Sequence, residues 1–237
     1  MKKFILLCLS IVCSMSMFAQ AWDNAKPDKQ FTFGVRAGLN LSSFSTDFSD
    51  SGYMWYHSEY IEKKGRMGFH VGVIADYNII KSFAVETGLF YTEKGCKFNP
   101  VDDREKRAYY DEEYFKNAED SVKISYVQLP ILALVRLYIA NDMHIQLKAG
   151  GYVAARVSTS NPPFCIGYFR DRHVYSDYED YKFYDSYSGW DAGIIAGAGI
   201  SYKNVYLGLQ YELGLTKLMS NHDIKNRNLA ISIGYDF

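Results

Sequence analysis

The sequence has little proline and cysteine, no excess charge of either sign, and no long hydrophobic run after its first 20 residues. Its 237 residues include 5 Pro, 4 Cys, and 26 basic against 27 acidic side chains. The balanced charge excludes a strongly basic nucleic-acid binder, and the 48% hydrophobic content excludes intrinsic disorder. A membrane-spanning helix needs about 18 consecutive apolar residues, which the rest of the chain does not supply. The whole-chain average is therefore that of a soluble globular domain, with an unexplained excess of 21 Tyr, 15 Phe and 18 Gly.

The first 21 residues have the pattern of a secretory signal peptide. Residues 1–3 form a positive n-region, residues 4–18 are apolar but short, and small residues allow cleavage after Ala19 or Ala21. Residues 22–30 are then expected to be a short periplasmic segment, and residues 31–237 form the folded domain.

Apolar and polar residues alternate strictly in eight segments of the mature chain. In the first, every odd residue from Phe31 to Leu41 is apolar. A period of two predicts β-strands with one apolar face. The eight segments are 31–41, 67–77, 83–91, 127–137, 145–153, 192–202, 205–215 and 229–237.

The two faces of these predicted strands differ in charge. None of the 45 apolar-face positions is Lys, Arg, Asp or Glu, whereas 7 of the 37 positions on the other face are charged and 12 are Gly. A soluble sandwich or lipocalin-like barrel would turn the apolar face inward, and a transmembrane barrel would turn it toward lipid.

The length of the segments and the length of the connections favour the membrane barrel. The segments have the 9–11 residues that a tilted strand needs to cross the hydrocarbon. Long connections (42–66, 92–126, 154–191) alternate with short ones (78–82, 138–144, 203–204), as in outer-membrane barrels with short periplasmic turns. The sequence therefore predicts an all-β, eight-stranded antiparallel up-and-down transmembrane β-barrel with three long external loops, located in the outer membrane. Its apolar face should contact outer-membrane lipid, and the C-terminal strand ending at Phe237 should contact the barrel-assembly machinery.

Short motifs along the mature chain resemble a known barrel family. They are Val35-Arg36-Ala37-Gly38-Leu39-Asn40, Gly68-Phe69-His70-Val71-Gly72, Val85-Glu86-Thr87-Gly88-Leu89, Tyr126-Val127-Gln128-Leu129-Pro130 and Gly234-Tyr235-Asp236-Phe237. They resemble the small outer-membrane barrels of Bacteroidetes, of the PorT or porin-family barrel domain type. The resemblance implies a fold rather than an activity, although one family member is linked to protein-secretion machinery. It also implies that Pro130 is tolerated in a strand, where the missing N–H predicts a bulge or a locally missing hydrogen bond.

Charged residues on the polar face are expected to meet inside the barrel. Eight strands enclose an interior just wide enough for side chains to fill, and isolated buried charges are costly. We therefore expect a structural ion-pair network that plugs the lumen, with Glu212 nearer the external end; the alternative is a small-solute or ion pore. The lumen network comprises Arg36, Asp76, Glu86, Arg136, Lys148, Glu212 and Asp236.

The sequence predicts no catalytic residue, cofactor or metal site. His70 occupies an inward position beside Gly68 and Gly72, and no serine accompanies it at strand spacing. Acidic residues within 177–185 do not have the spacing of an EF-hand loop. We expect a structural or interaction protein rather than an enzyme.

The long connections hold the tyrosine excess. Tyrosines recur every third residue in the third long loop, where they either pack over the barrel mouth or form an external surface for a glycan or an envelope protein. Cys96 and Cys165 both fall on the external side, as a disulfide between two loops or as free thiols. The loop tyrosines are Tyr175, Tyr178, Tyr181, Tyr184 and Tyr187.

Overall fold

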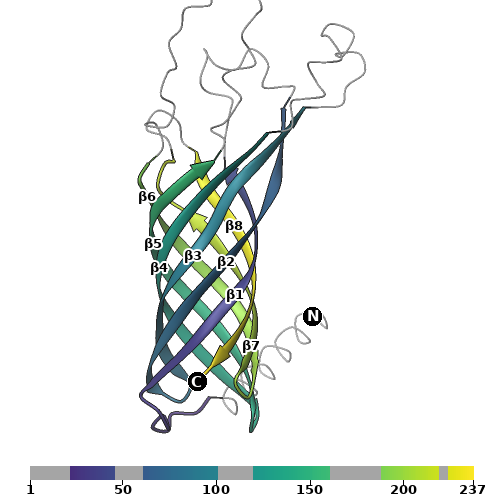
Figure 1. Cartoon of the computed structure of the whole chain (residues 1–237). Coiled ribbons are helices and arrows are strands. Elements are labelled where there is room, and N and C mark those ends of the chain that lie inside the picture. The colour runs from purple at the N-terminus through teal and green to yellow at the C-terminus, as the bar shows by residue number, and fades with distance from the viewer. Residues whose placement is uncertain (1–21, 46–60, 101–119, 161–187, 219–223) are drawn as a thin grey trace, which may run out of the picture.

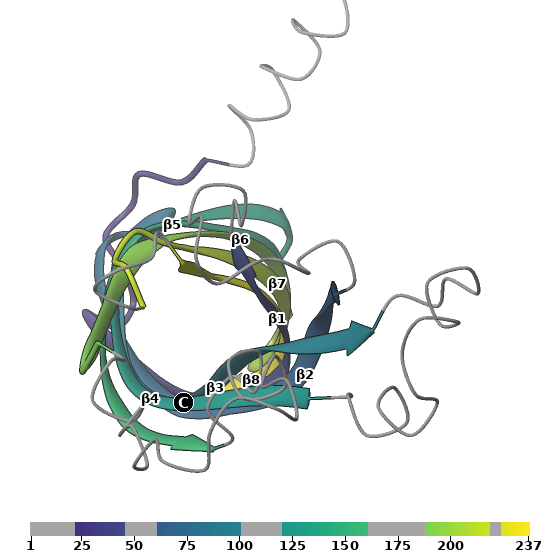
Figure 2. The ribbon, with the colours of Figure 1, turned by 90° about the horizontal axis from the view of Figure 1, so that it is seen from above.

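The chain forms one closed β-barrel in which each strand is antiparallel to its neighbours (Figures 1 and 2). The computed structural model describes residues 22–45, 61–100, 120–160, 188–218 and 224–237. The strands are β1 (Phe31–Ser45), β2 (Ile61–Ile80), β3 (Phe83–Pro100), β4 (Asp120–Ala140), β5 (Met143–Ser160), β6 (Trp190–Tyr202), β7 (Val205–Gly214) and β8 (Lys225–Asp236). The predicted eight-stranded up-and-down topology is confirmed, with β1 and β8 closing the barrel.

Tight turns lie at one end of the barrel, together with Phe237 (Figure 1). These turns are at 81–82, 141–142 and 203–204, and the strand ends that they do not join lie at the opposite end. Short turns are periplasmic in outer-membrane barrels, so the opposite end is external. Residues 22–30 lie beside the first turn, where the Lys81 amide donates to the Ala25 carbonyl at 3.0 Å. The predicted signal segment lies outside the described residues.

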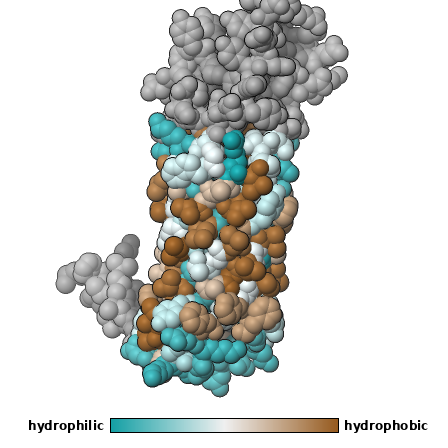
Figure 3. All heavy atoms as spheres, turned by 60° about the vertical axis from the view of Figure 1, so that its left-hand side comes forward, coloured by the Kyte–Doolittle hydropathy of each residue, from teal (hydrophilic) through white to brown (hydrophobic). Residues whose placement is uncertain are grey.

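Apolar residues gather in a band across the middle of the barrel face that Figure 3 shows, between more hydrophilic ends. Aromatic rings gather near its periplasmic edge, where the Phe31 and Tyr77 centroids are 5.3 Å apart and those of Tyr235 and Phe237 are 5.4 Å apart. The described residues contain no helix with the length and apolarity to cross a membrane. Exposed residues of the band include Phe33, Val35, Leu39, Val71, Val73, Leu89, Ile131, Val153, Ile194, Leu207, Leu209, Ile231 and Ile233.

Seven of the eight strands, all but β7, extend further toward the external end than the alternation predicts, and β2 to β5 extend furthest. β2 begins at Ile61, β3 ends at Pro100, β4 begins at Asp120 and β5 ends at Ser160. The expected loop bounds 42–66, 92–126 and 154–191 are therefore wrong at these edges.

The polarity of the two faces of β4 reverses at Ser125, and this reversal explains the misplaced bounds. Below Ser125, the outward residues Val127 and Leu129 are apolar and exposed. Above it, the inward residues Val122 and Ile124 are apolar and buried, whereas the outward Lys123 is charged. The β3–β4 ladder keeps one register throughout, so the faces themselves do not switch. A pattern search that follows one apolar face therefore stops at the reversal.

Pro130 interrupts one of the two ladders of β4. On the β5 side it pairs with Tyr152 without a break. On the β3 side the pairing passes from Thr87↔Ile131 to Phe90↔Gln128, without a partner for Pro130 and without a change of register. The expected locally missing pairing is thus present, and a bulge is not. The Thr87 hydroxyl donates to the Pro130 carbonyl at 2.9 Å on this side.

Candidate functional site in the barrel lumen

Three ion pairs lie near the periplasmic end of the lumen. Arg136 Nη2 of β4 is 2.5 Å from Asp76 Oδ2 of β2, and Lys148 Nζ of β5 is 2.5 Å from Glu86 Oε2 of β3. Arg36 Nη2 of β1 is 2.6 Å from Asp236 Oδ1 of the neighbouring β8. Six of the seven predicted lumen residues are therefore brought together in three pairs.

The first two pairs cross the lumen because the sheet register places like charges side by side. Asp76 and Glu86 are directly opposite each other in the β2–β3 ladder, an arrangement that is unfavourable for two carboxylates. The compensating cations come from β4 and β5, each two strands away from the carboxylate that it pairs with, and Arg136 also donates to Asn78 Oδ1 at 2.6 Å. The pairs thus tie β2 to β4 and β3 to β5 through the interior.

Tyr206 of β7 joins two of these pairs. The Arg36 guanidinium lies 4.3 Å from the ring centroid, and Lys148 Nζ lies 4.5 Å from it. Gly199 and Gly208 leave the space for the ring, since a Cβ at Gly199 would lie 2.5 Å from Tyr206 Cε2. Cations over an aromatic face are stabilised most where water is excluded. The interior glycines therefore serve to admit a few large side chains.

A second cluster surrounds Lys94 of β3, nearer the external end. Its Nζ lies 2.7 Å from Glu212 Oε2, 3.9 Å from Asp191 Oδ2, and 4.2 Å from the ring centroid of Tyr152. Asp191 also accepts hydrogen bonds from Tyr152 Oη at 2.9 Å and from Asn226 Nδ2 at 2.8 Å. Glu212 is therefore nearer the external end than the other six predicted residues, and its cation is one that the prediction missed.

The alternation pattern does not include Lys94 and Asp191, because the predicted strand segments are shorter than the strands of the structure. Both continue the inward face of their strands, Lys94 three residues after the predicted segment 83–91 and Asp191 one residue before the segment 192–202. Extending the alternation outward from Glu86 would have found Lys94. No local sequence signal pairs it with Glu212.

His70 bridges three strands in the middle of the lumen. Its Nε2 is 2.8 Å from Ser232 Oγ of β8, and its Nδ1 is 2.8 Å from Asn40 Oδ1 of β1. Asn40 Nδ2 donates to the Glu93 carbonyl at 2.9 Å, so Asn40 Oδ1 is the acceptor for His70 Nδ1–H. The other ring nitrogen, His70 Nε2, then accepts from the Ser232 hydroxyl. This serine–histidine–asparagine arrangement was not expected from strand spacing.

The same arrangement is closed to solvent. His70, Asn40 and Ser232 are all buried. The adjoining cavity, which His70, Glu86 and Glu212 help to line, has a volume of about 20 Å³, room for about one water molecule. The geometry therefore supports a structural hydrogen-bond bridge across the β1–β8 seam.

The external end of the lumen is filled by apolar side chains. They form a core around and above the Lys94 cluster, mostly from residues that the alternation assigns to loops. This apolar cap includes Phe44, Cys96, Val122, Ile124, Tyr126, Tyr152, Ala154 and Leu218.

Other predicted sites fall partly outside the described residues. Cys96 is buried, and Cys165 lies outside the described ranges, so the two alternatives for this pair, a disulfide or two free thiols, stay predictions. Tyr175, Tyr178, Tyr181, Tyr184 and Tyr187 also lie outside them. Within the described ranges, no group of three or more His, Cys, Asp or Glu side chains is placed to hold a metal ion.

Comparison with solved structures finds outer-membrane proteins of low sequence identity. Ail, the attachment invasion locus protein of Yersinia pestis, is 15% identical with a TM-score of 0.39, covering 88% of this chain and 100% of that chain. The outer membrane protein OprG of Pseudomonas aeruginosa is 9% identical with a TM-score of 0.44, covering 91% and 99%. Neisserial surface protein A is 13% identical with a TM-score of 0.42, covering 86% and 97%.

Residues 18–220 match the family described as the outer membrane protein beta-barrel domain. No curated protein matches the sequence. Because the family match spans most of the chain, this protein belongs to the outer membrane protein beta-barrel domain family and is an outer-membrane protein.

Proposed function

We propose that this protein is a closed barrel with a structural or interaction role at the cell envelope, and that recognition belongs to its external loops. The observation that carries the proposal is the filling of the lumen at successive heights. Charged pairs cross it near the periplasm, the Lys94 cluster crosses it higher up, and the apolar cap covers both. An eight-stranded barrel has no room for a wide channel beside such side chains.

The fixed pairing of the charges supports a structural role over a conducting one. A permeating ion would have to compete with cations that already lie 2.5 to 2.7 Å from their carboxylates. Breaking a buried pair is costly because it leaves an uncompensated charge. The serine–histidine–asparagine bridge is likewise part of the packed interior, which favours a non-enzymatic role.

Planar-bilayer recording of the pure, folded protein tests the closed barrel against the pore. We expect no steady openings in symmetrical KCl, with insertion verified separately by the resistance of reconstituted protein to protease. Stable, large openings from the pure protein would overturn the proposal in favour of a small-solute or ion pore.

The external loops supply the recognition surface in this proposal. The support is compositional: five tyrosines repeat every third residue from Tyr175 to Tyr187, and tyrosine provides contact area at low entropic cost. Replacing residues 170–188 by a Gly/Ser segment of equal length should abolish binding to an envelope protein or glycan on whole cells while leaving the folded barrel intact. Unchanged surface binding would exclude this loop as the recognition surface.

A finer family assignment also belongs to the proposal. The motifs at Val35–Asn40 and Gly234–Phe237 support a PorT-type barrel of Bacteroidetes. The C-terminal strand is proposed to engage the barrel-assembly machinery, and Phe237, which is 60% exposed, is the residue to truncate in an assembly assay.

A further inference from the structure

Lysines meet on the outer face of the barrel just above the apolar band. Lys64 of β2 and Lys97 of β3 are directly opposite each other in the β2–β3 ladder. Side chains that are directly opposite lie on the same face about 5 Å apart at Cβ, and two like charges there repel. Lys64 is exposed and Lys97 half-buried. The sheet therefore places two lysine side chains on adjacent strands at its surface.

Lys123 of β4 extends this pair across a third strand. It pairs with Gly95, two residues from Lys97 on the same face of β3. Its Nζ lies 3.2 Å from Glu93 Oε1, and Arg66 Nη2 lies 3.8 Å from Glu93 Oε2. Glu93 orients Lys123, while Lys64 and Lys97 take part in further interactions of their own. We call Lys64, Lys97 and Lys123 the basic patch.

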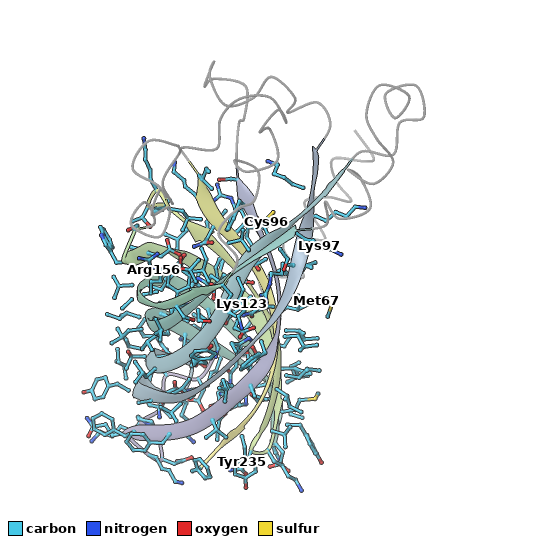
Figure 4. The ribbon with its side chains drawn as sticks, turned by 45° about the horizontal axis from the view of Figure 1, so that its top comes forward. Met67, Cys96, Lys97, Lys123, Arg156 and Tyr235 are labelled. Atoms are coloured by element: carbon cyan, nitrogen blue, oxygen red, sulfur yellow. The ribbon has the colours of Figure 1, made fainter. Side chains whose placement is uncertain are left out.

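The patch faces away from the lumen. Lys97 and Lys123 lie on the same faces of β3 and β4 as the exposed Leu89 and Leu129, because the β3–β4 register is constant. Figure 4 shows Lys97 above Met67 on one side of the barrel. Met67 is 68% exposed, so an apolar side chain lies open below Lys97.

The height at which the outward face of β4 changes from apolar to charged marks the membrane surface. A strand advances about 3.3 Å per residue and is tilted by about 45° in a membrane barrel. The stretch of β4 from Val127 to Ile139 therefore spans about 28 Å along the membrane normal. This matches the hydrocarbon thickness of about 25 to 30 Å. Tyr91 lies at the upper edge, with its ring centroid 5.6 Å from that of Phe69 and its Oη donating to Ser125 Oγ at 2.9 Å. Tyr91 is directly opposite Val127, and Lys123 lies two outward positions above Val127 on β4, at the level of lipid headgroups.

We propose that the basic patch binds the phosphate groups of anionic lipids in the external leaflet, with an acyl chain against Met67. A lysine is a compact cation that pairs with phosphate, and its long stem can lie along apolar surface. Three lysines on adjacent strands above an apolar wall match a ligand that carries phosphate at one end and hydrocarbon at the other. This site is independent of whether the lumen conducts.

Lipid retention by the folded, full-length mature barrel tests the site. The protein is delivered in neutral detergent containing either phosphatidylglycerol or phosphatidylcholine, and bound lipids are counted by native mass spectrometry. We expect a preference for phosphatidylglycerol that weakens at high salt. The variant K64Q/K97Q/K123Q should reduce affinity for phosphatidylglycerol by about tenfold or more, since each lysine near an anionic surface contributes severalfold.

A matched variant removes the same charge at the periplasmic end. K26Q/K29Q/K203Q changes three exposed lysines there and should retain phosphatidylglycerol like the wild type. Far-ultraviolet circular dichroism confirms folding of both variants. Equal retention of the two lipids, or equal losses in the two variants, would overturn the proposal. Displacement of the lipid by millimolar inorganic phosphate alone would also overturn it, because the site would then recognise phosphate without the hydrocarbon.

Discussion

His70 and Ser232 meet across the seam that closes the barrel, with 2.8 Å between Nε2 and Oγ, although they are 162 positions apart. Between them in the sheet lies Gly38, which is directly opposite His70 on one side and Ser232 on the other. The histidine therefore reaches over a strand that carries no side chain at this point. Removing either partner should loosen the junction between the first and last strands.

We expect His70→Ala to lower the free energy of unfolding by about 3 kcal/mol and Ser232→Ala by about 1 kcal/mol, because the first leaves a cavity and unsatisfied buried groups. Urea unfolding in lipid vesicles measures both, with Ser158→Ala, at an exposed serine, as control. The double variant should lose less than the sum of the single losses. A double variant whose loss of unfolding free energy equals the sum of the two single losses would contradict the bridge.

Gly38→Ala should destabilise the barrel although the change adds a single methyl group. The new Cβ would lie 2.6 Å from His70 Cε1 and would also collide with the Ile231 carbonyl oxygen. Overpacking of this kind costs about 1 to 3 kcal/mol. Gly189→Ala is the matched control, since nothing lies within 4 Å of a Cβ there, and it should unfold like the wild type in the same urea titration. Equal stability of the two variants would show that the interior tolerates a larger residue.

Lys148→Met should cost more than the loss of one contact. It leaves Glu86 without its cation and directly opposite Asp76, so we expect a loss of about 3 to 5 kcal/mol. The double variant K148M/E86Q removes both charges and should recover much of that stability. Urea unfolding of the single and double variants measures the recovery, and an equally unstable double variant would contradict the electrostatic explanation.

Cys96 should resist maleimide in the folded barrel and react once the barrel is unfolded. Its side chain is buried in the apolar cap, with Sγ 3.6 Å from the Lys64 carbonyl oxygen. Intact mass after denaturation without reductant should show two alkylations on the mature chain, one for each of Cys96 and Cys165. An absence of alkylation until reductant is added would instead establish the disulfide.

Much of the lumen network follows from strand parity alone. Arg36, Asp76 and Lys148 were placed inward because alternation is a local property that each strand displays separately. Lys94 is not predicted because the apolar outward positions of its strand give way to Glu93 directly after the segment 83–91, so the alternation pattern ends before it reaches Lys94. A method that assumes one environment along the whole strand cannot follow that change.

The sequence by itself determined the strand number, the order of long and short connections, and the face turned to lipid. These follow from the period of two and from the contrast in charge between faces, which need no knowledge of distant residues. Only the tertiary structure decided the partners: Lys94 with Glu212, Arg136 with Asp76, and His70 with Ser232. Closure and strand tilt set which inward positions share a height, and they depend on the register of all eight strands together.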